Sequence, residues 1–110
     1  MVKPRLKPWS GAALLSKIRE SLRDGRYQVT YHVELRCVER GVTLPDVFQV
    51  LETGRHEPRK DQFDAVEQEW HYAILGKTTD KVNLRVAVLF DDDGMLVLTV
   101  VNLSVKDERQ

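Results

Sequence analysis

A stretch with helical periodicity in the first half of the chain carries His32, Arg36 and Arg40 at intervals of four residues. Because an α-helix turns by about 100° per residue, this spacing places the three side chains within a stripe of roughly 80°. Guanidinium groups bind phosphate through forked donors, and imidazole exchanges a proton near neutral pH. Phosphodiester cleavage uses both abilities, so the stripe is a candidate catalytic face. The alternative is a solvated stripe whose cations pair with acids such as Glu39.

A further cation, Arg85, interrupts an otherwise apolar run from Val82 to Phe90. If a two-residue turn joins this run to the next strand, one face of the pair is continuously apolar. That face consists of Val86, Val88, Phe90, Val97, Thr99 and Val101. Arg85 is then expected on the opposite face, near Asn102 and beside Ala87 and Val100, where it could meet a ligand. The alternative is a surface arginine whose aliphatic stem packs on the sheet.

Two neighbouring residues, His71 and Tyr72, are candidates for the same face as Arg85. Alternation in a strand allows only one of them to lie there. The parity of the loop from Gly76 to Lys81 decides which, and the sequence leaves both open. Either side chain is a candidate RNA contact, and Tyr72 could stack on a base, although aromatic residues at strand spacing more often belong to the core.

Metal and cofactor chemistry is not indicated. Neither the three histidines nor the single cysteine, Cys37, shows the CxxC or HxxxH spacing of a metal site. The acidic run from Asp91 to Asp93 lacks EF-hand spacing and is typical of a hairpin turn. Cys37 lies among apolar residues and is expected to be a small buried hydrophobe. We therefore expect no metal and no cofactor.

Composition and charge narrow the class of protein. A chain of 110 residues that is 42% hydrophobic is expected to form one domain, residues 1–110. The net charge is zero, but residues 1–60 carry 12 Lys/Arg against 7 Asp/Glu, whereas residues 61–110 carry 5 against 10. An overall basic nucleic-acid-binding protein is thus excluded, and a polyanion site must be a local cluster.

The single cysteine allows no intramolecular disulfide, which favours a reducing compartment and hence the cytoplasm. The short apolar stretch from Ala12 to Leu15 is interrupted by Lys17, so we expect neither a signal peptide nor a membrane span.

Apolar periodicity predicts an α+β fold. Helices are expected over residues 10–24, 32–40 and 43–54. Thr43 and Asp46 form a capping-box-like start for the third helix. Strands are expected over residues 27–31, 55–60, 70–75, 82–90 and 95–103. Pro58 makes the second of them a short edge strand, and residues 61–68 are expected to be a loop.

The resulting order is α-β-α-α followed by an antiparallel meander of three to four strands, with the helices packed on one sheet face. Residues 1–8 are expected to be a loose arm, residues 10–24 an additional helix, and residues 104–110 a frayed tail.

A resemblance covers the segment from Tyr27 to Asn102. The residues that carry it are Val29-Thr30-Tyr31-His32, Arg36, Arg40-Gly41, Val42-Thr43, Thr53-Gly54, Leu84-Arg85-Val86-Ala87-Val88 and Val97-Leu98-Thr99-Val100. In these positions the chain resembles a bacterial domain-of-unknown-function family related to the RelE, BrnT and MqsR ribonuclease toxins.

The resemblance implies a RelE-like core over residues 27–103, with helices on one sheet face and RNA on the other. It also implies a metal-independent endoribonuclease acting on mRNA, the toxin of a type II toxin–antitoxin pair. The expected partners are RNA and an antitoxin protein, sometimes one bearing a zinc finger, that covers the active surface. The implied catalytic residues are His32, Arg36, Arg40 and Arg85, and the implied RNA-binding residues are Tyr72, His71 and Asn102.

Two other hypotheses remain open on the sequence. The chain could be a non-catalytic interaction domain whose arginine face or exposed sheet edge binds a protein, as its neutral charge allows. It could also self-associate through the edge strand at residues 55–60. The oligomeric state does not follow from the sequence.

Overall fold

The computed structural model describes residues 8–104. Within that range the elements are α1 (Gly11–Arg23), β1 (Tyr27–Val29), α2 (Tyr31–Arg40), α3 (Leu44–Thr53), β2 (Arg55–His56), the 3₁₀ helix η1 (Pro58–Lys60), β3 (Gln62–Asp64), β4 (Glu69–Lys77), β5 (Asn83–Asp91) and β6 (Gly94–Asn102). Most of the arm expected at residues 1–8 and of the tail expected at residues 104–110 lies outside the described residues. No helix in the described range has the length and apolar composition needed to cross a lipid bilayer.

The sheet is mixed, and its strand order is β1-β6-β5-β4-β2. Strands β4, β5 and β6 form the predicted antiparallel meander. Strand β1 adds to the outer edge of β6 in parallel, while β2 and β3 both pair with β4 in antiparallel. Helices pack on this sheet, so the predicted α+β class is confirmed.

The segment between β2 and β4 differs from the sequence prediction. The expected edge strand over residues 55–60 is only two residues long, because the 3₁₀ turn η1 starts at Pro58, where the fixed φ of proline suits a first helical turn. The expected loop contains β3, and Asp64 closes the following turn by accepting from the backbone N–H groups of Val66 and Glu67. Residues 55–68 therefore form a folded wall along β4.

The helix caps explain where the helices begin. The capping box of Thr43 and Asp46 is present as predicted. Thr30 caps α2 by accepting from the Val33 N–H at 3.2 Å. Ser10 occupies the N-cap position of α1 but makes no capping hydrogen bond; the Gly11 N–H is bound instead by the ring of His56, at 3.2 Å.

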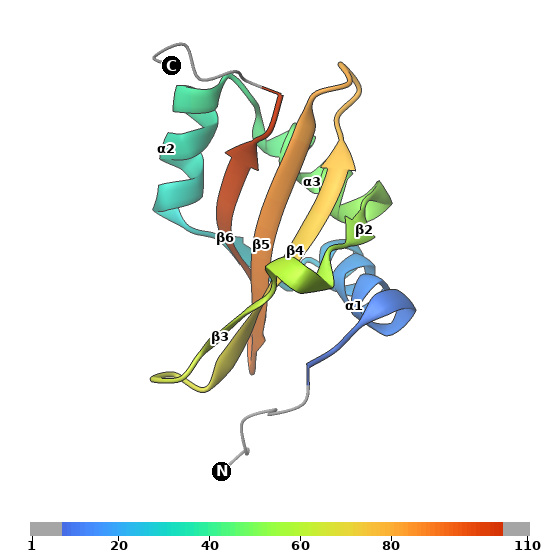
Figure 1. The fold of residues 1–110 in the computed structure, drawn as a ribbon, viewed down its shortest axis with the longest axis vertical. Coiled ribbons are helices and arrows are strands. Elements are labelled where there is room, and N and C mark those ends of the chain that lie inside the picture. The colour runs from blue at the N-terminus through green and yellow to red at the C-terminus, as the bar shows by residue number, and fades with distance from the viewer. Residues whose placement is uncertain (1–7, 105–110) are drawn as a thin grey trace.

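The core lies between the sheet and the helices. Figure 1 shows α1 and α3 behind the sheet and α2 at the left-hand edge beside β6, so the face toward the viewer carries no α-helix. The largest fully buried side chains are Leu14, Ile18, Val33, Val47, Val50, Leu51, Ile74, Leu84, Val86, Val88, Met95 and Val97. The strand face opposite to these residues is the open face of the sheet.

A β-bulge at Leu98 overturns part of the predicted strand faces. Ala87 pairs with Thr99 and Val88 pairs with Val97, so Leu98 is an extra residue in β6. Beyond the bulge the alternation is reversed: Val100 is buried against the helices, whereas Thr99 and Val101 share the face of Arg85. The bulge stands where the chain leaves β1, and Thr30 Oγ1 donates to the Leu98 carbonyl at 3.4 Å.

Gly94 begins β6 in a conformation that other residues rarely adopt. Its φ is 134°, and a Cβ there would overlap the carbonyl of Arg26, which accepts from the Met95 N–H. We expect Gly94→Ala to lower the free energy of unfolding by about 2 kcal/mol, measured by urea denaturation. Gly41→Ala is the matched control, because its φ is 69° but its Cβ would meet nothing within 4 Å. Equal losses in the two variants would show that the overlap at Gly94 contributes nothing.

Candidate functional site

The open face of the sheet contains a hollow of about 370 Å³, which we call the open-face hollow. It is lined by Lys60, Gln62, His71, Ala73, Arg85, Ala87, Leu98 and Thr99. Strands β4 and β5 supply its floor, the bulged part of β6 one side, and the η1–β3 segment the other. The hollow therefore combines an imidazole and two cationic side chains with a partly apolar base.

Arg85 is held inside this hollow by an ion pair with Glu57. Its Nε lies 2.7 Å from Oε1 and its Nη2 3.2 Å from Oε2 of the carboxylate. The hydrogen bonds from Arg85 lower the pKa of Glu57 against the opposing effect of burial, with smaller contributions from the charges of Arg85, Arg59 and Lys60. The same hydrogen bonds raise the pKa of Arg85. Both groups are thus ionised at neutral pH, and the guanidinium is fixed in place.

The part of this wall that carries Lys60 and Gln62 is anchored by Asp61, the residue between them. The Asp61 carboxylate is buried, accepts from the Ala73 N–H at 2.9 Å and contacts His56 Nε2 at 2.8 Å. With Asp61 drawn inward, its two neighbours remain at the hollow. Gln62 pairs across β3 and β4 with His71, which brings the imidazole beside the wall.

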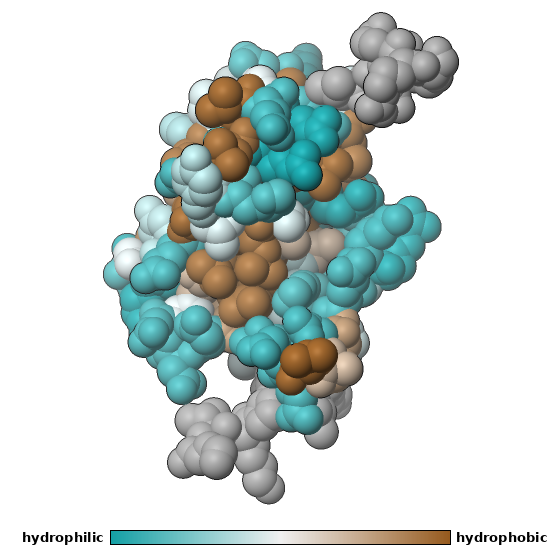
Figure 2. All heavy atoms as spheres, turned by 90° about the vertical axis from the view of Figure 1, so that its left-hand side faces the viewer, coloured by the Kyte–Doolittle hydropathy of each residue, from teal (hydrophilic) through white to brown (hydrophobic). Residues whose placement is uncertain are grey.

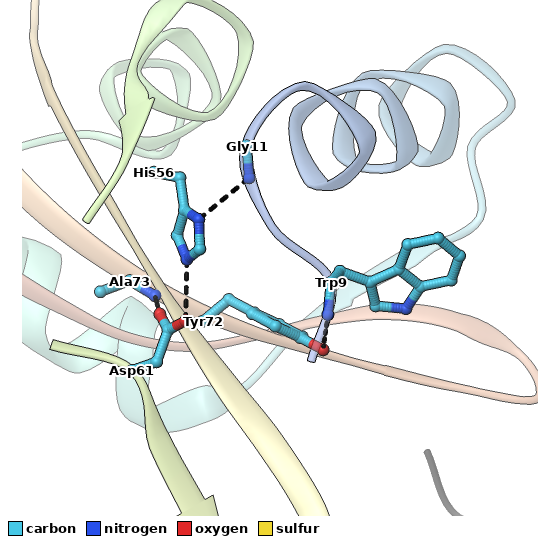
Figure 3. A network of polar contacts seen from close by, with 6 residues as sticks. All are labelled: Trp9, Gly11, His56, Asp61, Tyr72 and Ala73. Carbon is cyan, nitrogen blue, oxygen red and sulfur yellow. Dashed lines mark hydrogen bonds and ion pairs between the residues drawn. The ribbon is translucent and has the colours of Figure 1, made fainter. Parts of the chain in front are cut away.

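The anchoring network extends to the amino-terminal part of the chain, as Figure 3 shows. His56 Nδ1 accepts from the Gly11 N–H, so in the neutral ring the proton resides on Nε2 and is donated to Asp61. The hydroxyl of Tyr72 accepts a hydrogen bond from the backbone N–H of Trp9 at 3.0 Å. Gly11, at the start of α1, thus braces the segment that forms the wall, and Trp9 braces the adjacent strand β4.

Of His71 and Tyr72, the structure places His71 on the sheet face that carries Arg85. Tyr72 is only 3% exposed, lies on the helix-covered face and has its ring near those of His56 and Phe90. A ring buried there is not accessible for stacking on a base, so that role proposed for Tyr72 is not supported by its position. His71 shares the open face with Arg85.

The stripe of His32, Arg36 and Arg40 lies on α2, outside the hollow. Arg36 Nε approaches His32 Nε2 at 3.5 Å, and its Nη1 lies 3.5 Å from Glu39. Both the predicted cationic stripe and the alternative pairing with Glu39 are therefore present. Both contacts are long and solvent-exposed and hold the side chains weakly.

The stripe lies on the helix that packs beside β6. Figure 1 shows α2 at the edge of the sheet next to β6, and its buried side chains, Val33 and Cys37, face the core. The stripe therefore lies on the element next to the bulged strand that lines one side of the open-face hollow.

Two further residues singled out in the sequence, Asn102 and Cys37, have neighbours that indicate a structural role. Asn102 was expected on the face of Arg85, but it pairs with Leu84 and lies on the opposite face, because the bulge at Leu98 reverses the alternation of β6. Its Nδ2 donates to the Arg40 carbonyl at 3.0 Å, and its Oδ1 accepts from the Ser104 N–H. It ties the end of α2 to β6. Cys37 is buried as expected, and burial, with the charges of Asp46 and Glu34, raises the pKa of its thiol.

The structure therefore brings together two of the sequence candidates, His71 and Arg85, and adds residues that sequence reasoning missed. The additions are Glu57, Lys60, Gln62, Leu98 and Thr99. The alternation of Gln62 and Asp64 around Phe63 was the one available signal for β3, but three residues are too few for a dependable strand pattern.

Comparison with known proteins gives a family. A model described as "Domain of unknown function (DUF4258)" matches residues 29–102, more than half of the chain. No curated protein and no solved structure matches the chain. The match spans the elements from the end of β1 to β6, including the whole open-face hollow, and leaves α1 outside. The chain belongs to the DUF4258 family.

Proposed function

We propose that the open-face hollow binds the backbone of single-stranded RNA and cleaves it without a metal ion. The observation that carries this proposal is that His71 lies in one hollow with Lys60 and Arg85. An imidazole can move a proton, and two cations can hold a phosphodiester and stabilise the charge that develops on it. The resemblance to a family related to the RelE, BrnT and MqsR toxins points in the same direction.

In the proposed mechanism the 2′-hydroxyl of a ribose attacks the adjacent phosphorus. His71 takes the hydroxyl proton, while Arg85 and Lys60 stabilise the additional negative charge on the phosphate oxygens. The bond from phosphorus to the 5′-oxygen then breaks, that oxygen takes up a proton from water, and His71 returns the proton that it took to the solvent. The products are a 2′,3′-cyclic phosphate and a 5′-hydroxyl.

The α2 stripe extends this surface in the proposal. Since α2 packs beside β6, whose residues Leu98 and Thr99 line the hollow, Arg36 and Arg40 would contact neighbouring phosphates of the same RNA strand, and His32 would lie with them on the helix. Such phosphate contacts position a strand without reading its sequence. In a cell, this activity fits the toxin of a type II toxin–antitoxin pair, with mRNA as substrate and an antitoxin covering the open face.

The test is incubation of the purified chain with fluorescently labelled single-stranded RNA, with and without EDTA. We expect equal cleavage in both conditions and products that end in a cyclic phosphate and a 5′-hydroxyl, identified by mass spectrometry. As the matched variant, Lys60→Gln should weaken binding of uncleavable 2′-O-methyl RNA several-fold and reduce its dependence on salt. RNA that stays intact at micromolar protein would contradict the proposal.

A second candidate function is favoured by one observation on α2. Tyr31, Leu35 and Val38 are 72%, 44% and 83% exposed, and their spacing of four and three residues forms an apolar stripe directed away from the core. Figure 2 shows this side of the molecule, where hydrophobic and hydrophilic residues lie side by side over the part that contains α2. A non-catalytic domain that binds a partner protein through α2 would use this stripe.

The two candidates differ in what Val38→Glu does. For an interaction domain, this variant would lose the partner protein that the wild-type chain captures from lysate of its native cell, and neither the wild type nor the variant would cleave RNA. For a ribonuclease, RNA cleavage by the isolated chain would be unchanged.

A further inference from the structure

The guanidinium of Arg85 is already occupied on one side. The Glu57 carboxylate accepts hydrogen bonds from Nε and Nη2 of Arg85, with N···O distances of 2.7 and 3.2 Å. A phosphate would bind the guanidinium in the same paired arrangement. The ion pair is mostly buried: the side chain of Arg85 is 24% exposed and that of Glu57 is 12% exposed. The carboxylate is not a mobile surface group, because the Glu57 N–H donates to the Ala73 carbonyl at 2.9 Å and η1 follows directly.

We infer that Glu57 sets the affinity of the open-face hollow for phosphate, as an internal anion that competes for Arg85. This inference rests on the proposed function, in which the hollow takes a phosphate of RNA. An incoming oxyanion must either displace the carboxylate from Nε and Nη2 or use the donors that remain on the guanidinium. In both cases it approaches a site where one of the two positive charges is neutralised.

The consequence is a hollow that discriminates against small single anions. An isolated phosphate meets Lys60 and a neutralised Arg85, so it binds weakly. A strand of RNA also reaches the cations of the α2 stripe, and contacts made by several phosphates of one chain reinforce one another. Glu57 thus keeps the affinity for a single anion low, whereas a strand of RNA recovers affinity through its contacts with the α2 stripe.

The experiment compares inorganic phosphate binding by the wild type and Glu57→Gln, measured by isothermal titration at constant ionic strength and pH 7.5. Glutamine keeps the shape of the side chain but removes its charge, so we expect binding at least about tenfold tighter. Glu57→Asp, which keeps the charge, is the matched control and should bind as weakly as the wild type. The double variant Glu57→Gln, Arg85→Gln should lose the gain, because the gain acts through Arg85.

Thermal unfolding of each variant shows that it is folded before binding is compared. Phosphate binding by folded Glu57→Gln that is equal to or weaker than that of the wild type would overturn the inference. So would a gain that persists in the double variant, since it would then be a general charge effect. If the gain appears with inorganic phosphate but the wild type leaves RNA intact, Glu57 keeps this role and the ribonuclease proposal fails.

Discussion

Replacing His71 with glutamine should lower the rate of RNA cleavage by about 10²- to 10⁴-fold, the range expected when a general acid–base group is lost. Glutamine retains hydrogen-bonding atoms but cannot exchange a proton near neutral pH. Affinity for uncleavable 2′-O-methyl RNA should stay within about threefold of wild type, because Lys60 and Arg85 remain in the open-face hollow. Single-turnover cleavage and fluorescence anisotropy measure the two quantities separately.

His32→Gln is the control for this prediction. His32 lies on exposed α2 beside Arg36, outside the lining of the hollow, so its loss should change the cleavage rate only a few-fold. A large loss with His32→Gln and none with His71→Gln would move proton transfer to the α2 stripe. A wild-type rate in both variants would show that neither of these two imidazoles takes part in the mechanism.

Replacing Ile18 with alanine should lower the free energy of unfolding by about 3 kcal/mol, within the range measured for large-to-small changes in protein cores. Ile18 is fully buried, and together with Leu14 it forms the part of the core that α1 contributes. Although α1 lies outside the segment matched by the family, its apolar face closes the space over α3 and β2. Urea denaturation followed by circular dichroism measures the effect.

Val38→Ala is the matched control on another helix, because Val38 is apolar but exposed. Its effect should stay within about 0.5 kcal/mol. If Ile18→Ala costs as little as Val38→Ala, then α1 does not contribute to the core as the structure indicates.

The helices and the meander were predictable because their signals are local. A helix shows an apolar period and caps within a few residues, and the Thr43 and Asp46 capping box lies where the sequence placed it. The three long strands are nine residues each, are rich in apolar and aromatic side chains, and are joined by short turns. Patterns of that length specify the element type whatever the rest of the chain does.

Short and irregular elements were not predictable for the opposite reason. Strand β3 has three residues and exists because β4 offers it an edge, so its stability comes from pairing and not from its own pattern. The bulge at Leu98 also depends on a distant segment: Thr30, 68 residues earlier, binds its carbonyl. No local signal marks where alternation reverses, and the predicted face of Thr99 and Val101 was wrong as a result.

By itself the sequence determined the fold class, the boundaries of the long elements and the presence of a cationic stripe on α2, since each follows from periodicity along a few turns or strands. Only the tertiary structure decided which side chains share a site. Tyr72 went to the core and His71 to the open face, and Arg85 acquired a fixed carboxylate partner 28 residues away in Glu57. Such neighbours are set by strand register and by segments anchored across the sheet, which are properties of long-range packing that a local pattern does not contain.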